Sequence, residues 1–441
     1  MDFIKGKIES EAIRFSEAKS HIGQVVKVQG TVHKIRKMSG FAFVILRSAR
    51  DLMQTVYSVE FSKFDLNSIS EGSSIVVKGL VVEDQRSPIG CEIQMHYVEV
   101  LSKPYEEMPI IINYKKLDVN LDTNLQYRPL ALRNPRERAI FKLQEGIVRG
   151  FRDYLQKQSF TEIHSPKIVG AGAEGGSNIF TLDYFGKEVF LAQSPQFYKQ
   201  MMVGVFERVF EVGPVFRAEK HNTSRHLNEY VSLDIEMGFI KGFEDIMNLE
   251  TDLFKHIFEL LDSEYKNELE LLKVTLQKID QIPSVKFMEA KEILAEKFER
   301  NIADFEDLEP EEERLLCEFA KKEYNCPFIF VTHFPSSKRP FYAMDDPNDP
   351  NYTLSFDLLL NGLEITTGGQ RIHDYNEQLK KIEEKSLNPD DLQSFLMIHK
   401  HGLPPHGGFG MGLERLTMQL LGFQNVRNTS LFPRDINRVT P

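Results

Sequence analysis

Hydrophobic and polar residues alternate over short runs between residues 23 and 101. Five such runs, GQVVKVQGTVHKI, FAFVILRS, MQTVYSVEFS, SSIVVKGLVVED and CEIQMHYVEVLS, are rich in Val and Ile. Gly, Ser, Asp and Pro separate them, which is typical of strands joined by turns. Several short strands within so little chain predict a small closed β-barrel.

Aromatic and basic side chains gather on one predicted strand of this barrel and next to it. Phe41 and Phe43 alternate with small residues, and Arg36, Lys37 and Arg47 lie close by in the sequence. An exposed aromatic ring beside arginines is a platform on which nucleic-acid bases stack. We therefore expect a barrel of the OB type that binds nucleic acid. The alternative is that both phenylalanines belong to the barrel core.

The period of the pattern changes after a Pro-containing, weakly patterned connector. Ile140, Leu143, Ile147, Phe151 and Leu155 recur at the spacing of one helix face and predict an amphipathic helix. The expected division is an OB-type domain over residues 1–103, a linker over 104–135, and a second domain over 136–441 with an acidic helical insert near 241–325.

The second half of the chain predicts antiparallel strands with helices to one side, an α+β arrangement. Strand-like runs surround one short helix between residues 180 and 240, and further strands are expected at 327–333 and 354–366. A final helix is expected from about Gly410 to Leu421. Neither GxxxxGK[ST] nor GxGxxG occurs, so neither a P-loop nor a Rossmann fingerprint accounts for any nucleotide site.

Composition indicates a globular protein of a reducing compartment. The 441 residues carry a net charge of −11, with 41% hydrophobic and 27% charged residues. Cys91, Cys317 and Cys326 show no metal-ligand spacing and are expected to be buried thiols. No signal-like start and no apolar run of about 18 residues is seen, so we expect a cytoplasmic protein without membrane contact.

Four glycine-flanked polar islands could carry chemistry. They are EGGS with QSPQFYKQ, the hairpin loop FRAEKHNTSRHLNE, the run FDLLLNGLEITTGGQR, and HGGFGMGLER. Arg217, Arg225 and Arg415 lie in these islands, and an arginine fork fits phosphate oxygens. Asp357 and Glu364, seven residues apart along one expected strand, are suited to a hard cation such as Mg²⁺.

These residue types favour phosphoryl or nucleotidyl transfer by positioning and charge neutralisation. Lys199 and Arg371 would supply positive charge for an acidic substrate. The alternative is that these charged residues only form surface salt bridges in hairpins, which would account for one such island but not for four. His221 and His226 are more typical of hydrogen-bonding groups than of metal ligands. The glycines of GGFGMGLER also fit the start of a helix, whose first turn would place Arg415 near an anion site.

At these islands the chain resembles the class II aminoacyl-tRNA synthetases of the aspartyl, asparaginyl and lysyl subgroup, and within it the aspartyl-tRNA synthetases of archaeal and eukaryotic kind. The amphipathic helix with FTEIHSPKI is similar to motif 1, the dimer-forming element. FRAEKHNTSRHLNE is similar to motif 2 and GGFGMGLERL to motif 3. AEGGS, LAQSPQFYKQ and GLEITTGGQR resemble the amino-acid pocket of the subgroup. The likeness covers nearly the whole chain.

The resemblance implies activation of L-aspartate by ATP and its transfer to tRNA(Asp). Arg217 would bridge the aspartate carboxylate and the α-phosphate, Glu219 would hold the adenine amino group, and Arg415 would stack on adenine or hold the γ-phosphate; these three are the expected catalytic residues. The implied ATP-binding residues are Arg217, Ala218, Glu219, Arg225, His226, Leu227, Glu364, Gly412, Leu413, Glu414 and Arg415. The implied aspartate-binding residues are Glu174, Gln196, Lys199, Arg217, Thr367 and Arg371, with Tyr342 lining the pocket. The implied Mg²⁺ ligands are Glu364, Thr367 and Asp357, with Thr367 standing where the family more often has Ser.

The resemblance also implies a tRNA partner and a second copy of the chain. Phe43, Arg47, Gln54 and Glu92 would contact the anticodon. His33 and Pro88 match the family pattern that does not discriminate tRNA(Asp) from tRNA(Asn). Proline offers no donor to a base. We therefore expect both tRNAs to receive aspartate, which links the chain to an amidotransferase acting on Asp-tRNA(Asn). The alternative is that His33 and Pro88 are neutral and the base is read elsewhere.

Three rival functions share this pattern. An asparaginyl-tRNA synthetase has the same fold, and so does a paralogue that makes free asparagine from aspartate and ATP. The basic barrel disfavours the paralogue. A catalytically inactive tRNA-binding protein would be expected to lack Arg217, Glu364 or Arg415, and all three are present.

Overall fold

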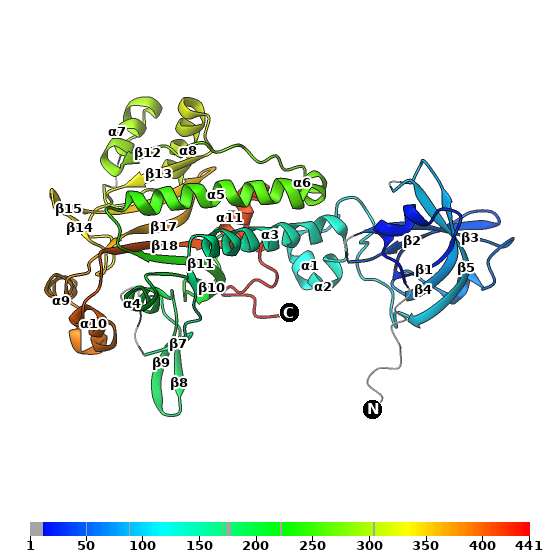
Figure 1. Cartoon of the computed structure of the whole chain (residues 1–441), viewed down its shortest axis with the longest axis horizontal. Helices are drawn as coiled ribbons and strands as arrows, with labels where there is room; N and C mark the ends of the chain where they lie inside the picture. The colour runs from blue at the N-terminus through cyan, green and yellow to red at the C-terminus, as the bar shows by residue number, and fades with distance from the viewer. Residues whose placement is uncertain are drawn as a thin grey trace. The chain divides into compact units, whose positions relative to one another are not determined.

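The computed structural model describes residues 12–49, 51–87, 89–170, 172, 178–220, 223–302 and 305–441. The chain forms two compact units, Met1–Pro135 and Arg136–Pro441 (Figure 1). Within these described ranges, no helix has both the length and the apolar character to cross a membrane.

The first unit contains a closed five-stranded barrel with the order β1-β2-β3-β5-β4, which confirms the predicted OB barrel. Ala42, Val44 and Leu46 alternate into the core, so Phe41 and Phe43 point outward. Phe41 is 39% exposed, and the two rings meet edge to face at 5.5 Å. The alternative that both rings are core residues is therefore wrong. The barrel elements are η1 (Phe15–His21), β1 (Val25–Lys37), β2 (Phe41–Arg47), β3 (Leu52–Ser58), η2 (Leu66–Ser68), β4 (Ser74–Glu83) and β5 (Cys91–Ser102).

The segment expected as a connector has local structure. It holds two short helices, α1 (Leu121–Gln126) and α2 (Arg128–Ala131). Ile110, Ile112, Leu117 and Ala131 form a small buried cluster. The Arg128 guanidinium is buried and donates a 2.7 Å hydrogen bond to the Asn124 side chain. Helices this short are not visible as periodicity, because each completes only one or two turns.

The second unit is built on an eight-stranded, mostly antiparallel sheet, which confirms the predicted α+β class. Its strand order is β12-β13-β16-β17-β18-β11-β10-β6, with parallel pairing only at the two edges. The strands are β6 (Thr161–Glu162), β10 (Arg208–Phe216), β11 (Glu229–Gly238), β12 (Ser284–Lys286), β13 (Phe328–Thr332), β16 (Ser355–Leu360), β17 (Leu363–Arg371) and β18 (His406–Gly412). Smaller sheets hold β7 (Ile168–Val169), β8 (Thr181–Tyr184), β9 (Lys187–Leu191), β14 (Asp345–Asp346) and β15 (Asp349–Thr353).

The predicted amphipathic helix is α3 (Pro135–Lys157), and it packs against α5 (Glu244–Glu264) (Figure 1). Close contact of the two helices depends on Gly146 and Gly150, because a Cβ at Gly146 would lie 2.6 Å from a methyl of Leu261. Both helices bury their apolar faces with one side of the sheet in the main core. The other helices are α4 (Gln196–Phe206), α6 (Lys266–Leu272), α7 (Phe287–Phe298), α8 (Pro310–Tyr324), α9 (Tyr375–Glu384), α10 (Gln393–Lys400), α11 (Leu413–Leu421), η3 (Pro389–Leu392) and η4 (Val426–Asn428).

Two sequence predictions are wrong near the centre of the sheet. The glycine run HGGFGMG is strand β18, and the last helix begins only at Leu413. The run predicted as one strand at 354–366 is a hairpin, β16 and β17, which turns at Asn361 and Gly362, both with positive φ. Asp357 and Glu364 therefore lie on neighbouring strands. The three thiols are buried as expected.

Candidate functional site

The alternation of residues on β11 makes the floor of a cavity. Leu233 and Ile235 point into the core, while Ser232, Asp234 and Glu236 point to the opposite face. These residues read as VSLDIEM in the sequence, so two acids fall on the same face of a central strand.

The neighbouring strand β18 keeps this floor open because it has glycine at every second position. A Cβ at Gly408 would lie 2.5 Å from a carboxylate oxygen of Glu236, and one at Gly410 would lie 3.1 Å from Asp234 Oδ1. Phe409 and Met411, between these glycines, fill the core on the other side. The glycine pattern is thus explained by the acids beside it, and not by a helix start.

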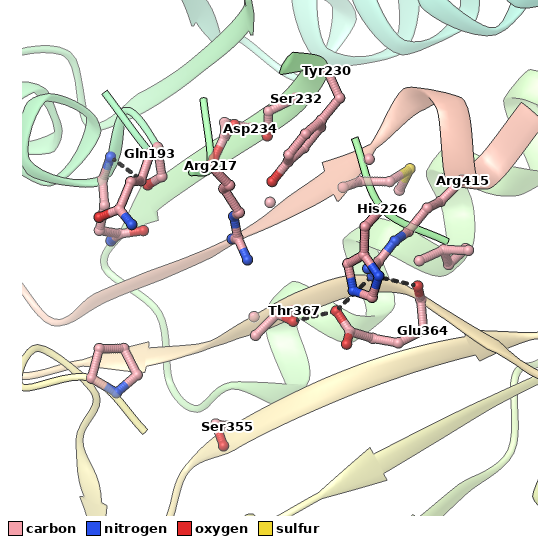
Figure 2. A pocket seen from close by; sticks show the side chains of 18 of the residues that line it. Gln193, Arg217, His226, Tyr230, Ser232, Asp234, Ser355, Glu364, Thr367 and Arg415 are labelled. Carbon is pink, nitrogen blue, oxygen red and sulfur yellow. Dashed lines mark hydrogen bonds and ion pairs between the residues drawn. The ribbon is translucent and has the colours of Figure 1, made fainter. Parts of the chain in front are cut away.

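The cavity has a volume of about 320 Å³ and is lined by residues from each of the four predicted polar islands, although EGGS itself lies outside the described residues. In Figure 2, Arg217 lies between Gln193 and a group formed by His226, Glu364 and Arg415. Charged side chains from the β10–β11 connection, β11, β17, α4 and α11 therefore meet in one place.

One end of the cavity holds two buried cations against two buried anions. Lys199 Nζ is 2.9 Å from Asp234 Oδ1 and 3.5 Å from Glu236 Oε2, and donates to the Phe409 carbonyl at 3.0 Å. Arg371 Nε donates to Glu236 Oε1 at 3.0 Å. Burial acts to raise the pKa of Glu236, but Arg371 and Lys199 outweigh it and the pKa is lowered. Opposite charges are thus paired where water is excluded.

A buried chain of side-chain contacts fixes the orientation of Gln196 at the same end. His406 Nδ1 lies 2.9 Å from the Pro404 carbonyl, so this nitrogen carries the proton and Nε2 accepts from Gln200 at 3.0 Å. Burial lowers the pKa of His406 to about 4, which keeps the ring neutral. The Gln200 oxygen then accepts from Gln196 Nε2 at 3.0 Å. This leaves the Gln196 oxygen as an acceptor toward the cavity.

Arginine and histidine from the β10–β11 connection form the middle of the cavity. Arg217 extends from the end of β10 over the ring of Tyr230, with 6.0 Å between guanidinium and ring centre. Its NH1 lies 3.9 Å from Glu219, whose other oxygen lies 3.7 Å from His226 Nε2. His226 Nδ1 contacts the Thr223 hydroxyl at 2.6 Å.

The far end of the cavity contains two more arginines. Arg225 NH1 donates to Glu313 Oε2 at 3.0 Å, and Arg225 NH2 to the Gly362 carbonyl at 3.3 Å. Arg415, in the first turn of α11, donates from Nε to the Arg225 carbonyl at 3.4 Å and lies 3.7 Å from Glu364 Oε1. This end is suited to a polyanion, because arginine forks fit phosphate oxygens.

The three predicted metal ligands, Asp357, Glu364 and Thr367, lie close together although Asp357 is on β16 and the other two are on β17. The Thr367 hydroxyl donates to Glu364 Oε1 at 2.9 Å, and Thr367 pairs with Asp357 across the β16–β17 hairpin. Asp357 is buried, and its Oδ2 accepts from Arg339 NH2 at 2.8 Å. Burial, together with Glu364, raises the pKa of Asp357. Glu364 and Thr367 line the cavity, whereas Asp357 lies behind it.

Most residues predicted for the nucleotide and amino-acid sites line the cavity, with four differences. Ala218 and Leu413 do not line it: Ala218 donates its N–H to the Asn178 carbonyl, and Leu413 is in the core. Glu414 lines it but turns its carboxylate to the Val231 N–H at 3.1 Å, and burial raises its pKa to about 7. Glu174 lies outside the described residues.

Sequence reasoning missed several polar residues that line the cavity or lie directly behind its lining. Asp234 and Glu236 were visible as acids at alternate positions of a central strand, which is an unusual place for carboxylates. Glu313 and Arg339 had no local signal, because each reaches its partner from a distant segment. Tyr342, expected to line the pocket, does so, and its ring lies 5.3 Å from the Arg371 guanidinium.

The predicted anticodon residues lie on the outward-facing side of the barrel strands. Gln54 donates to Glu92 Oε2 at 2.8 Å across β3 and β5, and burial raises the pKa of Glu92. Phe43 is half-buried on the adjacent strand. Arg47 is buried instead of exposed, and its NH1 lies 3.4 Å from His33 Nδ1. Pro88 and His221 lie outside the described residues.

Comparison with known proteins agrees with this geometry. The family described as tRNA synthetases class II (D, K and N) matches residues 120–436, and the OB-fold nucleic acid binding domain family matches residues 26–101. The Aspartate–tRNA(Asp/Asn) ligase of Thermus thermophilus is 47% identical over 96% of this chain and 99% of its own. The Aspartate–tRNA(Asp) ligase of Pyrococcus abyssi is 38% identical over 95% of this chain and 97% of its own. The crystal structure of asparaginyl-tRNA synthetase from Pyrococcus horikoshii, complexed with asparaginyl-adenylate, superposes with a TM-score of 0.91 at 31% identity, covering 98% of this chain and 100% of that one.

Proposed function

Since this chain belongs to the class II tRNA synthetases of the D, K and N group, we propose that it activates L-aspartate with ATP and transfers the aspartyl group to tRNA. The observation that carries the choice of aspartate is that the buried cations Lys199 and Arg371 lie together at one end of the cavity. Both cations can add charge-assisted hydrogen bonds to a side-chain carboxylate, and these are stronger than the bonds that a neutral amide would accept.

In the first step, an α-carboxylate oxygen of aspartate attacks the α-phosphorus of ATP. A carboxylate–phosphate bond forms, the bond to the β-phosphate oxygen breaks, and pyrophosphate leaves with the electron pair. Arg217, in the middle of the cavity, neutralises charge on the carboxylate and the α-phosphate. The nucleophile is already ionised, so no side chain has to remove a proton.

In the second step, a ribose hydroxyl of the terminal tRNA nucleotide attacks the activated carbonyl carbon. The ester bond forms, the bond to the phosphate oxygen breaks, and AMP leaves as the hydroxyl proton is released.

The Gln196 oxygen and Asp234, which faces the cavity, are acceptors for the ammonium group of aspartate. Glu219 and His226 belong to the nucleotide side of Arg217.

The donor set at Glu364 fits Mg²⁺. Glu364 and Thr367 present hard oxygen atoms to the cavity, with Asp357 behind them. Protein sites for Mg²⁺ use one or two carboxylates and complete the shell with phosphates and water. Bound there, Mg²⁺ would neutralise charge on the ATP phosphates. Arg415 lies beside Glu364 and takes the remaining phosphate charge.

For the tRNA, we propose that aspartate is attached to both tRNA(Asp) and tRNA(Asn). Support comes from the relative at 47% identity, whose name covers both tRNAs, whereas the relative at 38% identity is named for tRNA(Asp) alone. His33 and Pro88 add to this support through the family pattern. Product on tRNA(Asn) would need a tRNA-dependent amidotransferase. The anticodon would be read by Phe43 and the Gln54–Glu92 pair.

A homodimer formed through α3 completes the proposal. This helix resembles the dimer-forming motif 1, and a groove along it is lined by Phe141, Val148, Leu413 and Leu431. Sedimentation analysis of the full chain should give twice the monomer mass. A monomer at micromolar concentration would contradict this part.

The first test is ATP–pyrophosphate exchange with aspartate and, separately, with asparagine. Exchange with aspartate alone supports the assignment, whereas exchange with asparagine alone would replace it with the asparaginyl enzyme. Unmodified transcripts of tRNA(Asp) and tRNA(Asn) are then charged with labelled aspartate. Comparable efficiency on both supports the dual specificity; charging of tRNA(Asp) alone would leave the aspartate assignment intact and remove the role given to His33 and Pro88.

A further inference from the structure

An acid from the helical insert lies behind the phosphate end of the cavity and contacts an arginine that lines it. Glu313, in the first turn of α8, accepts a 3.0 Å hydrogen bond from Arg225 NH1, and its side chain is 12% exposed. Arg225 lines the cavity, and the two residues are 88 positions apart in the chain.

A carboxylate at this place needs a physical reason. ATP brings several negative charges, and Glu364 already supplies a carboxylate there for Mg²⁺. An ionised acid there would repel the triphosphate. Burial, with Glu364 nearby, raises the pKa of Glu313 to about 8, which limits this repulsion near neutral pH and leaves a carboxyl oxygen as the acceptor for Arg225. The reason for an acid at this place is therefore the side chain that it holds.

Glu313 is one of two fixed points on the Arg225 guanidinium. The other is the Gly362 carbonyl, which accepts from NH2 at 3.3 Å. Gly362 is in the β16–β17 turn with φ of +91°, and a Cβ there would lie 3.1 Å from the Arg314 Cα of α8. The turn therefore packs directly on the backbone next to Glu313. Both acceptors belong to one rigid contact between α8 and the sheet.

Two terminal nitrogens held in this way restrict the side-chain torsions of Arg225. A free arginine side chain loses rotamer entropy when it is fixed. Arg415 shares the arrangement, because its Nε donates to the Arg225 carbonyl at 3.4 Å. Fixing Arg225 before the nucleotide binds lowers the entropy lost on binding.

We propose that Glu313 is a positioning residue, which holds Arg225 in the orientation that meets the outer phosphates of ATP. The acidic insert near 241–325, to which the sequence assigned no role, thereby contributes to nucleotide binding. This inference rests on the proposed function, because it takes ATP as the ligand at this end of the cavity.

The test is a double-mutant cycle between Glu313 and Arg225 in the full chain, read by ATP–pyrophosphate exchange. Glu313→Ala is expected to raise the KM for ATP on the order of tenfold, because an unrestrained Arg225 loses rotamer entropy when ATP binds, with a smaller change in kcat and none in the KM for aspartate. In the Arg225→Ala background the same substitution should have little further effect, because the side chain it positions is gone.

Two variants make this test specific. Glu313→Gln keeps an oxygen acceptor for Arg225 and should restore most of the ATP affinity. Glu318→Gln is the matched control on the same helix: its carboxylate is 53% exposed and pairs with Arg314, so no change is expected. Should Glu313→Ala fail to fold, Glu313→Gln against Glu313→Lys, with thermal unfolding of each, makes the same comparison.

Three outcomes overturn the proposal. One is a lower KM for ATP in Glu313→Ala, which would mean that repulsion was the main effect of the acid. Another is an equal effect in the Arg225→Ala background. A third is a raised Mg²⁺ requirement independent of Arg225, which would make Glu313 a metal ligand. ATP binding by equilibrium dialysis separates this inference from the proposed function, because dialysis needs no amino-acid activation.

Discussion

Replacing Glu236 by glutamine should lower the unfolding free energy of the second unit by more than the loss of one hydrogen-bond acceptor would, because it also removes a buried negative charge. The side chain is fully buried and is shared by Arg371 Nε at 3.0 Å and Lys199 Nζ at 3.5 Å. The substitution keeps the shape and one oxygen acceptor but removes the charge. Two buried cations would then face only Asp234.

The magnitude follows from charges at these distances. One ion pair at 3.0 Å is worth about 5 kcal/mol at an effective dielectric constant of about 20. Removing one partner of a buried pair typically costs about 3–5 kcal/mol. Because glutamine still accepts from Arg371, and Lys199 keeps Asp234 and the Phe409 carbonyl, we expect about 3 kcal/mol.

The assay is urea unfolding followed by circular dichroism at about pH 6, since the chain has no tryptophan. Glu250→Gln is the matched control. Glu250 is as buried as Glu236, but burial raises its pKa to about 8, so at this pH it is already neutral. Its substitution should not lower the unfolding free energy, because glutamine removes the cost of protonating Glu250 on folding. Equal losses for the two variants, or a loss below about 1 kcal/mol for Glu236→Gln, would refute the reasoning.

Three more predictions concern the pH dependence, the nucleotide and the metal. The native state keeps a proton on Glu250 that the unfolded chain releases above about pH 4.5, so this residue lowers the unfolding free energy as pH rises from about 5 to about 8, by at most about 1.4 kcal/mol per pH unit. The urea midpoint should therefore fall less steeply with pH in Glu250→Gln than in the unsubstituted chain, and parallel curves for the two would contradict this. Arg217→Ala should lower kcat/KM in pyrophosphate exchange by about 100- to 1000-fold, and Arg217→Lys should not restore it, since a lysine lacks the fork; near-normal exchange in either variant would exclude Arg217 from the reaction. Thr367→Val should raise the Mg²⁺ concentration for half-maximal exchange by about tenfold while Thr367→Ser should not, and the same Mg²⁺ curve for both would remove the hydroxyl from the metal site.

The sequence by itself determined the two kinds of domain. Strict alternation on five short strands gives a barrel with one inner face, and the Val- and Ile-rich runs leave little choice of register. The helical period of α3 likewise follows from its apolar positions alone. Polar islands of unusual residue type, such as the loop holding Arg217 and Arg225, marked the cavity because neither core packing nor an ordinary turn accounts for them.

Only the tertiary structure decided where β16, β17 and β18 begin and end, and which buried acids are charged. The run HGGFGMG reads as a helix start until the floor acids of β11 lie beside it, and then its glycines are required by close approach. Asp357 and Glu364 look like one strand until Gly362 turns the chain onto α8. The sequence also could not tell which acids are ionised. Glu236 and Glu250 are both buried glutamates, but Arg371 and Lys199 lie beside Glu236 and keep it charged, whereas burial raises the pKa of Glu250. Local pattern reports which face a residue takes, whereas contacts between distant segments set its partners and therefore its charge.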